Sequence, residues 1–418
     1  MSTFRVRPSG PLHGRVEISG ATKNSGTKQM AAALLASGVT TLRNMPPVAD
    51  LGVMIELLEE IGASVDVRPG NEVLIDASGT LQPQAPYELV TRMRASFNVL
   101  GPLVARCGEA RVALPGGDNI GSRKVDMHLR GLEAMGAQID VDHGFVHARA
   151  NRLAGARIVL EFPSVGATEN LMCAAVLAKG GTVIDNAARE PEVTDLAAFL
   201  DRMGAHVVGA GTSTIEVEGV DELVAVDSEI MGDRVEAGTL LMACGIAGGE
   251  IELVGTRLEH LEIVAAKLCE MGMRVSPTPD GIWAQSPGPL RAVDIATLPH
   301  PGFATDFMPT AVALMSVAEG SSIVTENIYD GRFQFVDELV RMNADVRTEG
   351  RHAVVRGVSR LAGAPVTASD VRAGAALVLA GLAADGETTV YGCEHIERGY
   401  HDLPATLRRL GADVEKIA

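Results

Sequence analysis

The chain repeats one pattern six times. A helical pattern closes on Gly-Ala or a close variant at six places with near-constant spacing: Gly62, Gly136, Gly204, Gly272, Asn343 and Gly411. A second marker, an Ala- and Leu-rich run that ends in glycine, keeps the same period and ends at Gly38, Gly108, Gly180, Gly248, Gly320 and Gly386. Because two independent markers share one period over the whole chain, we predict six copies of one structural unit.

Each unit begins with a helix of small apolar residues. Such a helix is apolar on all sides and is therefore expected to be buried. We expect these helices at 30–37, 98–106, 170–178, 238–247, 309–318 and 373–384. A short strand such as 39–42 follows, and an amphipathic helix such as 129–135 leads to each Gly-Ala. Residues 138–149 are typical of a hairpin that turns at His143 and Gly144.

Six such units predict an α/β protein with two pseudo-threefold domains, in which three buried helices form each core and sheets lie outside them. We place one domain at 22–231, including a glycine-rich loop at 115–126. The second domain comprises 1–21 and 232–418. The strand-like N-terminal segment could complete the sixth unit, which would bring the two ends of the chain together.

Composition excludes several classes of partner. The chain of 418 residues has a net charge of -17 and only 3% aromatic residues. Neither nucleic acid nor an anionic membrane suits an acidic surface, so a six-repeat sliding clamp around DNA is disfavoured. Five cysteines without a Cys-x-x-Cys motif indicate a reducing cytoplasm, and we expect no disulfide and no metal site. The chain begins without a signal peptide, and its apolar runs are too short to span a bilayer.

The clearest break in the repeat is the segment 114–128. Pro115, Gly117 and Gly121 allow sharp turns around Asp118, which favours a hinged lid that carries this aspartate over a site. The segment contains neither a P-loop nor a dinucleotide-binding fingerprint. Taken alone, the segment is more typical of a plain glycine-rich surface loop.

Basic residues recur beside the predicted starts of buried helices. They are Lys23, Arg94, Arg123, Arg234, Arg372 and Arg398. Arginine binds carboxylate and phosphate through two parallel hydrogen bonds, so this recurrence in an acidic chain favours a focused anion site. Each residue alone could form a surface ion pair. Asp306 precedes another buried helix, where an aspartate is either a helix cap or a general base.

Together these segments resemble the enolpyruvyl transferases, specifically the UDP-N-acetylglucosamine 1-carboxyvinyltransferases. The resemblance covers essentially the whole chain. Its most specific pieces are Lys23-Asn24, Met93 to Ser96, the 115–126 loop, Ser164 to Thr168, Ala187 to Glu192, Pro301 to Asp306, Asp370 to Ala373 and Arg398-Gly399-Tyr400.

The resemblance implies a two-domain inside-out α/β barrel with its active site in the inter-domain cleft. It implies transfer of the enolpyruvyl group of phosphoenolpyruvate to the 3-hydroxyl of UDP-N-acetylglucosamine, with release of phosphate. This reaction is the first committed step of peptidoglycan synthesis. The implied partners are phosphoenolpyruvate and a uridine nucleotide or nucleotide-sugar, and no cofactor or metal is implied.

The resemblance also implies roles for individual residues. Lys23, Arg123 and Arg398 match positions that bind phosphoenolpyruvate, and Asp306 matches a candidate general base near the sugar hydroxyl. Asp118 stands where the family has its proton donor. The other matched positions surround the nucleotide-sugar or support closure of the cleft: Asn24, Arg94, Lys124, Val125, Asp126, Met127, Ser164, Val165, Gly166, Ile328, Asp370 and Arg372.

The chain departs from the family pattern at three places. The family usually has cysteine at the position of Asp118, and fosfomycin alkylates that thiol, so we expect this chain to be insensitive to fosfomycin. Thr22 is an extra residue before the Lys-Asn pair. Lys124 replaces a proline, and Phe307-Met308 replaces a more polar pair.

These departures leave the acceptor open. One alternative is a paralogue that acts on another uridine nucleotide, such as UMP, in specialised metabolism. A second alternative is a nucleotide-sugar-binding protein without catalytic activity. A shikimate-phosphate acceptor is disfavoured, because the nucleotide-sugar segments match better.

Overall fold

The computed structural model describes residues 2–118, 120–121 and 124–417, and the chain forms two compact units. Unit 1 contains Met1–Ser19, Asp118–Arg123 and Gly232–Ala418. Unit 2 contains Gly20–Gly117 and Lys124–Met231. The short segment that begins at Asp118 therefore clusters with unit 1, although the chain on both sides of it belongs to unit 2.

Three buried helices form the core of unit 2: α1 (Lys23–Ala33), α4 (Leu100–Cys107) and α6 (Val165–Ala175). More exposed helices and one 3-10 helix flank them: α2 (Ala49–Glu60), α3 (Tyr87–Val90), η1 (Arg94–Val99), α5 (Asp126–Ala134) and α7 (Pro191–Arg202). The strands are β3 (Val39–Arg43), β4 (Ser64–Arg68), β5 (Glu72–Asp76), β6 (Gln84–Ala85), β7 (Glu109–Ala113), β8 (Gln138–Asp142), β9 (Phe145–Arg149), β10 (Arg157–Val159), β11 (Gly181–Asp185), β12 (His206–Val208), β13 (Thr214–Glu218) and β14 (Asp227–Glu229).

Unit 1 has the same plan, with α8 (Arg234–Ala247), α10 (Met308–Met315) and α12 (Val371–Leu382) in its core. Its other helical elements are η2 (Leu258–His260), α9 (Glu262–Met271), η3 (Thr305–Phe307), α11 (Val336–Arg341), η4 (Ile396–Arg398) and α13 (Leu403–Arg409). Its strands are β1 (Thr3–Arg7), β2 (Leu12–Glu17), β15 (Gly249–Val254), β16 (Arg274–Thr278), β17 (Gly281–Ser286), β18 (Ile295–Ala296), β19 (Ser321–Thr325), β20 (Asp345–Glu349), β21 (His352–Arg356), β22 (Leu361–Ala362), β23 (Pro365–Thr367), β24 (Ala384–Asp385), β25 (Thr388–Tyr391) and β26 (Asp413–Ile417).

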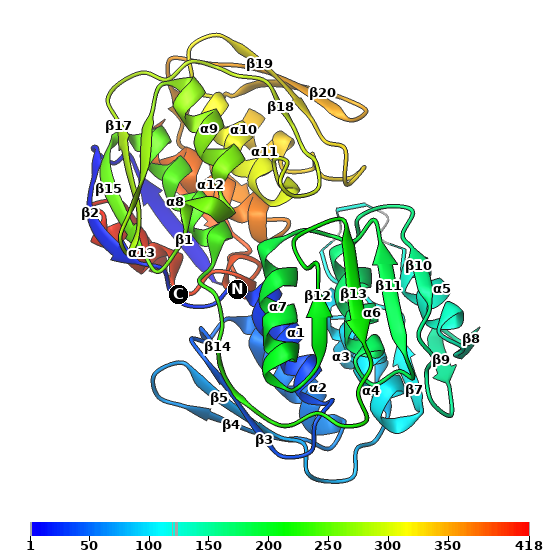
Figure 1. The fold of residues 1–418 in the computed structure, drawn as a ribbon. Helices are drawn as coiled ribbons and strands as arrows, with labels where there is room; N and C mark the ends of the chain where they lie inside the picture. The colour runs from blue at the N-terminus through cyan, green and yellow to red at the C-terminus, as the bar shows by residue number, and fades with distance from the viewer. Residues whose placement is uncertain (1, 119, 122–123, 418) are drawn as a thin grey trace. The chain divides into compact units, whose positions relative to one another are not determined.

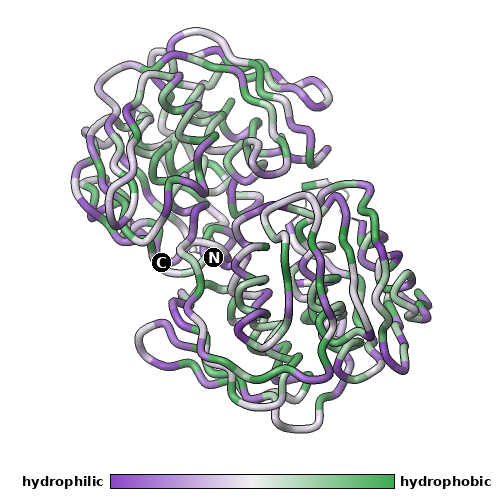
Figure 2. Tube along the Cα trace, viewed as in Figure 1, coloured by the Kyte–Doolittle hydropathy of each residue, from purple (hydrophilic) through white to green (hydrophobic). Residues whose placement is uncertain are grey.

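In each unit the sheets surround the inner helices (Figure 1). The inner helices carry much of the hydrophobic sequence, and hydrophilic residues are frequent in the connecting loops (Figure 2). The predicted buried helices are thus confirmed, but some bounds differ: α6 begins at Val165 rather than at 170, α8 begins at Arg234 rather than at 238, and the first helix differs most. Residues 30–37 were expected as a helix, but α1 begins at Lys23 and ends at Ala33. Its earlier start follows from the cap at Thr22, whose hydroxyl accepts a hydrogen bond from the Asn24 amide.

Small residues allow the inner helices to approach closely. A Cβ atom added at Gly101 of α4 would lie 2.3 Å from the backbone oxygen of Asn170 on α6. Gly101 instead donates its amide to Asn170 Oδ1 at 2.7 Å. A larger residue would therefore push these two helices apart, which explains the glycine in an otherwise apolar helix.

Six four-stranded sheets follow one topology. In the order β10-β11-β13-β12, the first pair is parallel and the other two are antiparallel. The predicted hairpin is confirmed as β8 and β9, with positive φ at His143 and Gly144 in the turn. Asn343 adopts φ 64 where other units have glycine, a conformation that asparagine tolerates better than most residues.

The sixth sheet joins the two ends of the chain. Its order is β23-β25-β1-β26, so β1 occupies the place that β13 has in the third sheet. Thr3 pairs with Ile417 at one end of the β1–β26 ladder. The N-terminal strand β1 thus completes the sixth of the six sequence repeats, as predicted. Strand β2 pairs with β15 and so belongs to the fourth repeat. The chain begins and ends where the other units have a hairpin turn.

Candidate functional site

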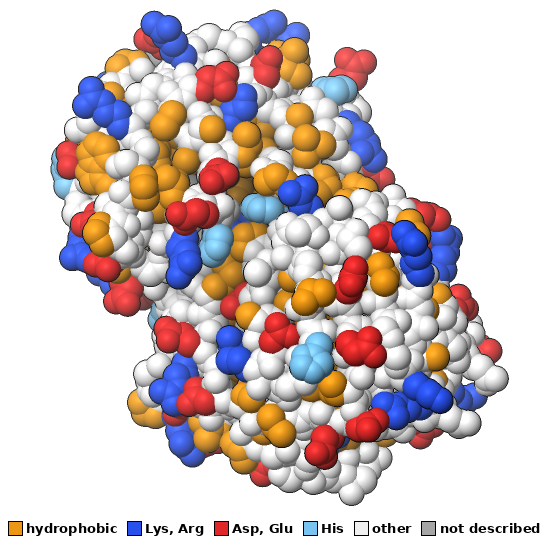
Figure 3. Space-filling model, viewed as in Figure 1, with side chains coloured by type: hydrophobic (Ala, Val, Ile, Leu, Met, Phe, Trp, Pro, Cys, Tyr) orange, Lys and Arg blue, Asp and Glu red, His pale blue; other side chains and the backbone are white. Residues whose placement is uncertain are grey.

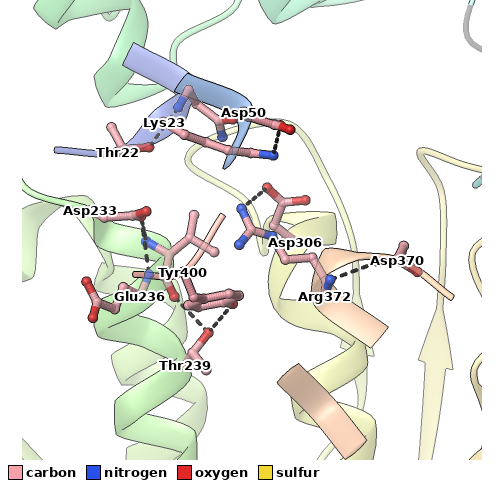
Figure 4. A network of polar contacts seen from close by, with 12 residues as sticks. Thr22, Lys23, Asp50, Asp233, Glu236, Thr239, Asp306, Asp370, Arg372 and Tyr400 are labelled. Atoms are coloured by element: carbon pink, nitrogen blue, oxygen red, sulfur yellow. Dashed lines mark hydrogen bonds and ion pairs between the residues drawn. The ribbon is translucent and has the colours of Figure 1, made fainter. Parts of the chain in front are cut away.

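In unit 1, the carboxylate of Asp306 contacts two buried arginines, Arg332 and Arg372, and Figure 4 shows Arg372 beside it. Arg332 Nη2 lies 3.3 Å from Asp306 Oδ1, and Arg372 Nη2 lies 3.4 Å from Oδ2. The arginine side chains are only 3% and 6% exposed, whereas that of Asp306 is 29% exposed. The aspartate therefore presents a carboxylate at the open side of a buried cationic pair.

Local structure places each member of this cluster. Asp306 lies in η3, whose N-cap is Ala304, so the helix-cap interpretation of Asp306 is wrong. The neighbouring Phe307 packs against Gly238 of α8. Asp370 caps α12, and its Oδ1 accepts the Arg372 amide at 2.8 Å, which fixes the start of the helix that carries Arg372.

The arginines retain unused donors. Arg332 Nε and Arg372 Nη1 are buried, and neither has a hydrogen-bond partner among the described residues. Burial alone would lower the pKa of Arg372, but Tyr400, Asp306 and Asp233 raise it above its usual value. A buried, permanently charged group with an unused donor is suited to bind an anion.

The aromatic ring of Tyr400 supports the Arg372 side chain. Its guanidinium lies 5.3 Å from the centre of the Tyr400 ring, and the Tyr400 hydroxyl lies 2.8 Å from Thr239 Oγ1 (Figure 4). Burial raises the pKa of Tyr400. These contacts restrict the rotamers of Arg372 and so position its charge toward Asp306.

The segment that begins at Asp118 is held within unit 1. The Asp118 carboxylate forms an ion pair with Arg398 of η4. Gly331 donates its amide to Ile120 O at 3.3 Å. Gly121 approaches so closely that an added Cβ would lie 2.0 Å from Asp330 Oδ1. Arg123, also predicted as a site residue, lies outside the described residues.

In unit 2, Lys23 and Asn24 form the first turn of α1. Lys23 Nζ lies 2.8 Å from Oδ2 of the buried Asp50, and Figure 4 shows this pair. The extra residue Thr22 supplies the helix cap. The predicted pair of residues is thus placed at the N-terminus of a buried helix, where the amide groups favour an anion.

The remaining predicted residues of unit 2 lie at two helix starts. Arg94 Nη2 donates to Lys124 O at 3.1 Å, directly before α5, and Val125, Asp126 and Met127 follow at its start. Ser164 caps α6, and its Oγ accepts the Ala167 amide at 3.3 Å. The structure brings 124–127 and 164–166 together, because an added Cβ at Gly166 would contact His128 at 3.4 Å.

Ile328 was predicted on unit 1 and is half-buried there. Its amide donates to Glu326 Oε1 at 2.7 Å, and Glu326 Oε2 accepts the Thr305 hydroxyl at 2.8 Å. The buried Glu326 therefore links the loop of Ile328 to η3, next to Asp306.

Sequence analysis did not select Arg332 or Asp50. Arg332 follows Asp306 by 26 positions, and nothing in its local sequence marks it. Asp50 occurs in the first turn of α2, where an acidic residue is expected for reasons of helix stability alone. Only the tertiary contact with Lys23 distinguishes it.

The chain matches known proteins over nearly its whole length. Residues 6–407 match the family described as EPSP synthase (3-phosphoshikimate 1-carboxyvinyltransferase). The chain belongs to the EPSP synthase family. It is 50% identical to a UDP-N-acetylglucosamine 1-carboxyvinyltransferase of Corynebacterium jeikeium over 415 residues, which cover 99% of each chain. It is accordingly an enolpyruvyl (carboxyvinyl) transferase.

Solved structures of EPSP synthase family proteins agree with the six-sheet architecture. The enolpyruvyl transferase NikO from Streptomyces tendae is 27% identical, with a TM-score of 0.88 over 99% of both chains. EPSP synthase from Acinetobacter baumannii is 20% identical, with a TM-score of 0.76 over the full length of both chains. The predicted inside-out α/β fold is confirmed by this likeness.

On the face shown in Figure 3, acidic and basic side chains are interspersed. Among the described residues, no helix combines the length and the apolar character needed to cross a membrane. Within the same residues, no group of three His, Cys, Asp or Glu side chains is arranged to hold a metal ion.

Proposed function

We propose that this enzyme transfers the enolpyruvyl group of phosphoenolpyruvate to the 3-hydroxyl of UDP-N-acetylglucosamine and releases phosphate. This proposal assigns it to the first committed step of peptidoglycan synthesis, in the cytoplasm. The observation that carries it is the identity of 50% to a UDP-N-acetylglucosamine 1-carboxyvinyltransferase over 99% of both chains. The matched region covers 99% of this chain and so spans the predicted site segments.

In the proposed reaction, the sugar oxygen forms a bond to C2 of phosphoenolpyruvate while C3 takes up a proton. The sugar hydroxyl loses its proton in the same step. The resulting tetrahedral phospho-ketal then loses phosphate and one proton from C3, which gives the enolpyruvyl ether. The enzyme must therefore supply a base for the hydroxyl, an acid for C3 and cations for the phosphate and carboxylate.

We assign the base to Asp306. Its contacts with Arg332 and Arg372 favour the ionised carboxylate, which is the form that can accept a proton. Asp370 positions Arg372 by capping α12. Ile328 is assigned to the acceptor, and Glu326 orients its loop relative to Asp306.

We assign proton transfer to C3 to Asp118, with aspartate in place of the usual loop cysteine. Asp118 pairs with Arg398, which we also assign to phosphoenolpyruvate. An anion at Arg398 would compete with Asp118 for the same guanidinium and would free the Asp118 carboxyl group from this ion pair. Binding of phosphoenolpyruvate would thereby convert Asp118 into an acid.

In unit 2, we assign Lys23 and Arg123 to the anionic groups of phosphoenolpyruvate and Asn24 to the sugar. The nucleotide part of the acceptor is assigned to two segments and one arginine. These are Lys124, Val125, Asp126 and Met127, then Ser164, Val165 and Gly166, together with Arg94.

The test is phosphate release from phosphoenolpyruvate by the purified protein, with UDP-N-acetylglucosamine and UMP as parallel acceptors. Release that requires UDP-N-acetylglucosamine and is lost in Asp306→Ala supports the proposal. Release with UMP alone would reject this acceptor in favour of another uridine nucleotide. Nucleotide binding without release under either condition would reject a catalytic role.

A further inference from the structure

The core of unit 2 contains an ion pair that the reaction described above does not use. Lys28 of α1 and Glu169 of α6 are 8% and 0% exposed, and Lys28 Nζ lies 2.8 Å from Glu169 Oε2. Glu169 Oε1 is buried and has no hydrogen-bond partner among the described residues. Burying two charges costs free energy, so a pair placed inside an apolar three-helix core is unlike the packing around it.

This pair connects to the residues beneath the acceptor segments, which we define as 124–127 and 164–166. Asn98 Nδ2 lies 3.3 Å from Gly166 O and 3.5 Å from Glu169 Oε2. The Asn98 side chain therefore connects Glu169 to Gly166, which lies in the first turn of the same helix, α6, and belongs to the second acceptor segment.

The neighbouring residue of α6 reaches the first acceptor segment. Asn170 Nδ2 lies 3.1 Å from His128 Nδ1, and His128 follows Met127 directly in α5. The Asn170 carbonyl accepts the Gly101 amide, so its amide nitrogen donates to the histidine. The His128 ring also packs edge-on against Phe97, with ring centres 5.2 Å apart.

We propose that Lys28 and Glu169 are positioning residues for the nucleotide-sugar acceptor, acting through Asn98, Asn170 and His128 on the two acceptor segments. This inference rests on the function proposed above. The ion pair holds α6 against α1 in one register. The side-chain amides of Asn98 and Asn170 couple that relative position of the helices to the starts of α6 and α5. An unpaired charge at either position should therefore weaken binding of the acceptor and leave binding of phosphoenolpyruvate almost unaffected.

The charge state of this network sets its pH dependence. Burial raises the pKa of Glu169 to about 7, which Lys28 counteracts and the nearby glutamates of α7 reinforce. Burial lowers the pKa of His128 to about 3, so the histidine adds no charge near neutral pH. The titratable groups that interact with Glu169 lie on α1, on α6 itself and at the start of α7: Lys28, Cys173, Glu190 and Glu192.

Lys28→Met removes the cation and should raise the pKa of Glu169 further. At pH 6 Glu169 is then neutral, and acceptor binding should stay within about threefold of wild type. At pH 8.5 burial of an unpaired carboxylate is opposed more strongly, and the affinity should fall about tenfold. The measurement is the Kd of UDP-N-acetylglucosamine by calorimetry at both pH values, with the KM of phosphoenolpyruvate measured alongside.

Three further variants separate positioning from general damage. Lys28→Met combined with Glu169→Gln should restore binding at pH 8.5 to within about threefold, because no unpaired charge remains. Lys28→Arg should bind like wild type. Arg157→Met is the matched control, since it removes a cation from an exposed pair with Asp185 in the same unit, and it should change neither constant.

If Lys28→Met fails to fold, Glu169→Gln replaces it. This variant should match wild type at pH 6, where Glu169 is protonated, and bind more weakly at pH 8.5. The inference would be overturned if Lys28→Met or Glu169→Gln bound UDP-N-acetylglucosamine like wild type at both pH values. Equal losses at both pH values that the double variant does not rescue would also overturn it. Wild-type protein that does not bind UDP-N-acetylglucosamine would instead reject the proposed function.

Discussion

Asp118 and Arg398 form an ion pair although 280 positions separate them in the chain. Both side chains are 19% exposed, so the pair is accessible to a small anion yet partly shielded from water. In this pair the Asp118 carboxylate accepts a hydrogen bond from the Arg398 guanidinium. The proposed role of Asp118 as an acid therefore depends on exchange of its partner for the substrate.

Asp118→Asn tests this exchange. The amide cannot donate a proton to C3, so we expect kcat to fall by about 100-fold or more. The same change removes a competitor for Arg398, so phosphoenolpyruvate should bind severalfold more tightly. Single-turnover rates and the Kd of phosphoenolpyruvate measure the two effects. Unchanged or weaker binding would contradict the competition between Asp118 and substrate.

Asp118→Cys should make the enzyme sensitive to fosfomycin. A thiolate is a far better nucleophile toward an epoxide than a carboxylate is, so wild type should keep its activity during incubation with the drug while the variant loses it with time. Mass spectrometry of the intact protein should show one adduct, in the variant only. An active variant that stays resistant would contradict the assignment of Asp118 to the loop position. A covalent adduct on the native Asp118 would contradict the predicted insensitivity.

Arg332→Met should reduce kcat by about 100-fold while the protein stays folded, because Asp306 would lose one of its two cationic partners. Arg332→Lys keeps the charge but changes the geometry of the donors, and we expect an intermediate rate. Arg341→Met is the control, since Arg341 forms an exposed pair with Glu338 in the same unit. Equal rates for Arg332→Met and wild type would remove Arg332 from the site.

Glu236 should make unit 1 less stable as the pH rises. Its carboxylate accepts hydrogen bonds from the Ser19 amide and hydroxyl at 2.9 and 2.5 Å, and burial raises its pKa to about 7. Because its pKa is raised, Glu236 holds its proton more tightly in the folded protein than in the unfolded chain. This stabilises the folded protein fully below the unfolded-state pKa, and the contribution is lost as the pH rises through the folded-state pKa. From pH 4.5 to 7 the loss amounts to about 3 kcal/mol.

Glu236→Gln should flatten this part of the curve of unfolding free energy against pH. Denaturant titrations at several pH values, with the exposed Glu259→Gln as the control, measure the difference. A curve for Glu236→Gln that runs parallel to that of wild type would show that Glu236 does not titrate in this range.

Gly238→Ala should disturb the site through packing. The added Cβ would lie 2.3 Å from Phe307 Cε1, which forces the ring beside Asp306 to move and costs about 1–3 kcal/mol. We expect a lower melting temperature and a kcat reduced about tenfold. Gly52→Ala is the matched control, because no atom lies within 4 Å of its added Cβ in α2. It should stabilise the helix by about 1 kcal/mol.

The repeat pattern predicted the inner helices well, because a helix that is apolar on all sides is stable in water only when it is buried. The start of α1 was missed because Lys23 to Lys28 are polar by composition, and their burial depends on partners from other repeats. Lys28 illustrates this: a lysine in a helix is expected in solvent, and only Glu169 on α6 makes its burial possible. Arg332 and Asp50 also escaped selection, because only their tertiary contacts with Asp306 and Lys23 distinguish them.

The sequence by itself determined the six-unit architecture, the buried helices, the closing of the sixth unit by the N-terminal strand and the family resemblance. These properties follow from periodicity, glycine placement and local motifs, which act over short stretches of chain. The tertiary structure decided which charges meet: Asp306 with Arg332 and Arg372, and Asp118 with Arg398. Electrostatic pairing depends on distance in space, and residues far apart in the chain become partners only when the core has brought their helices together.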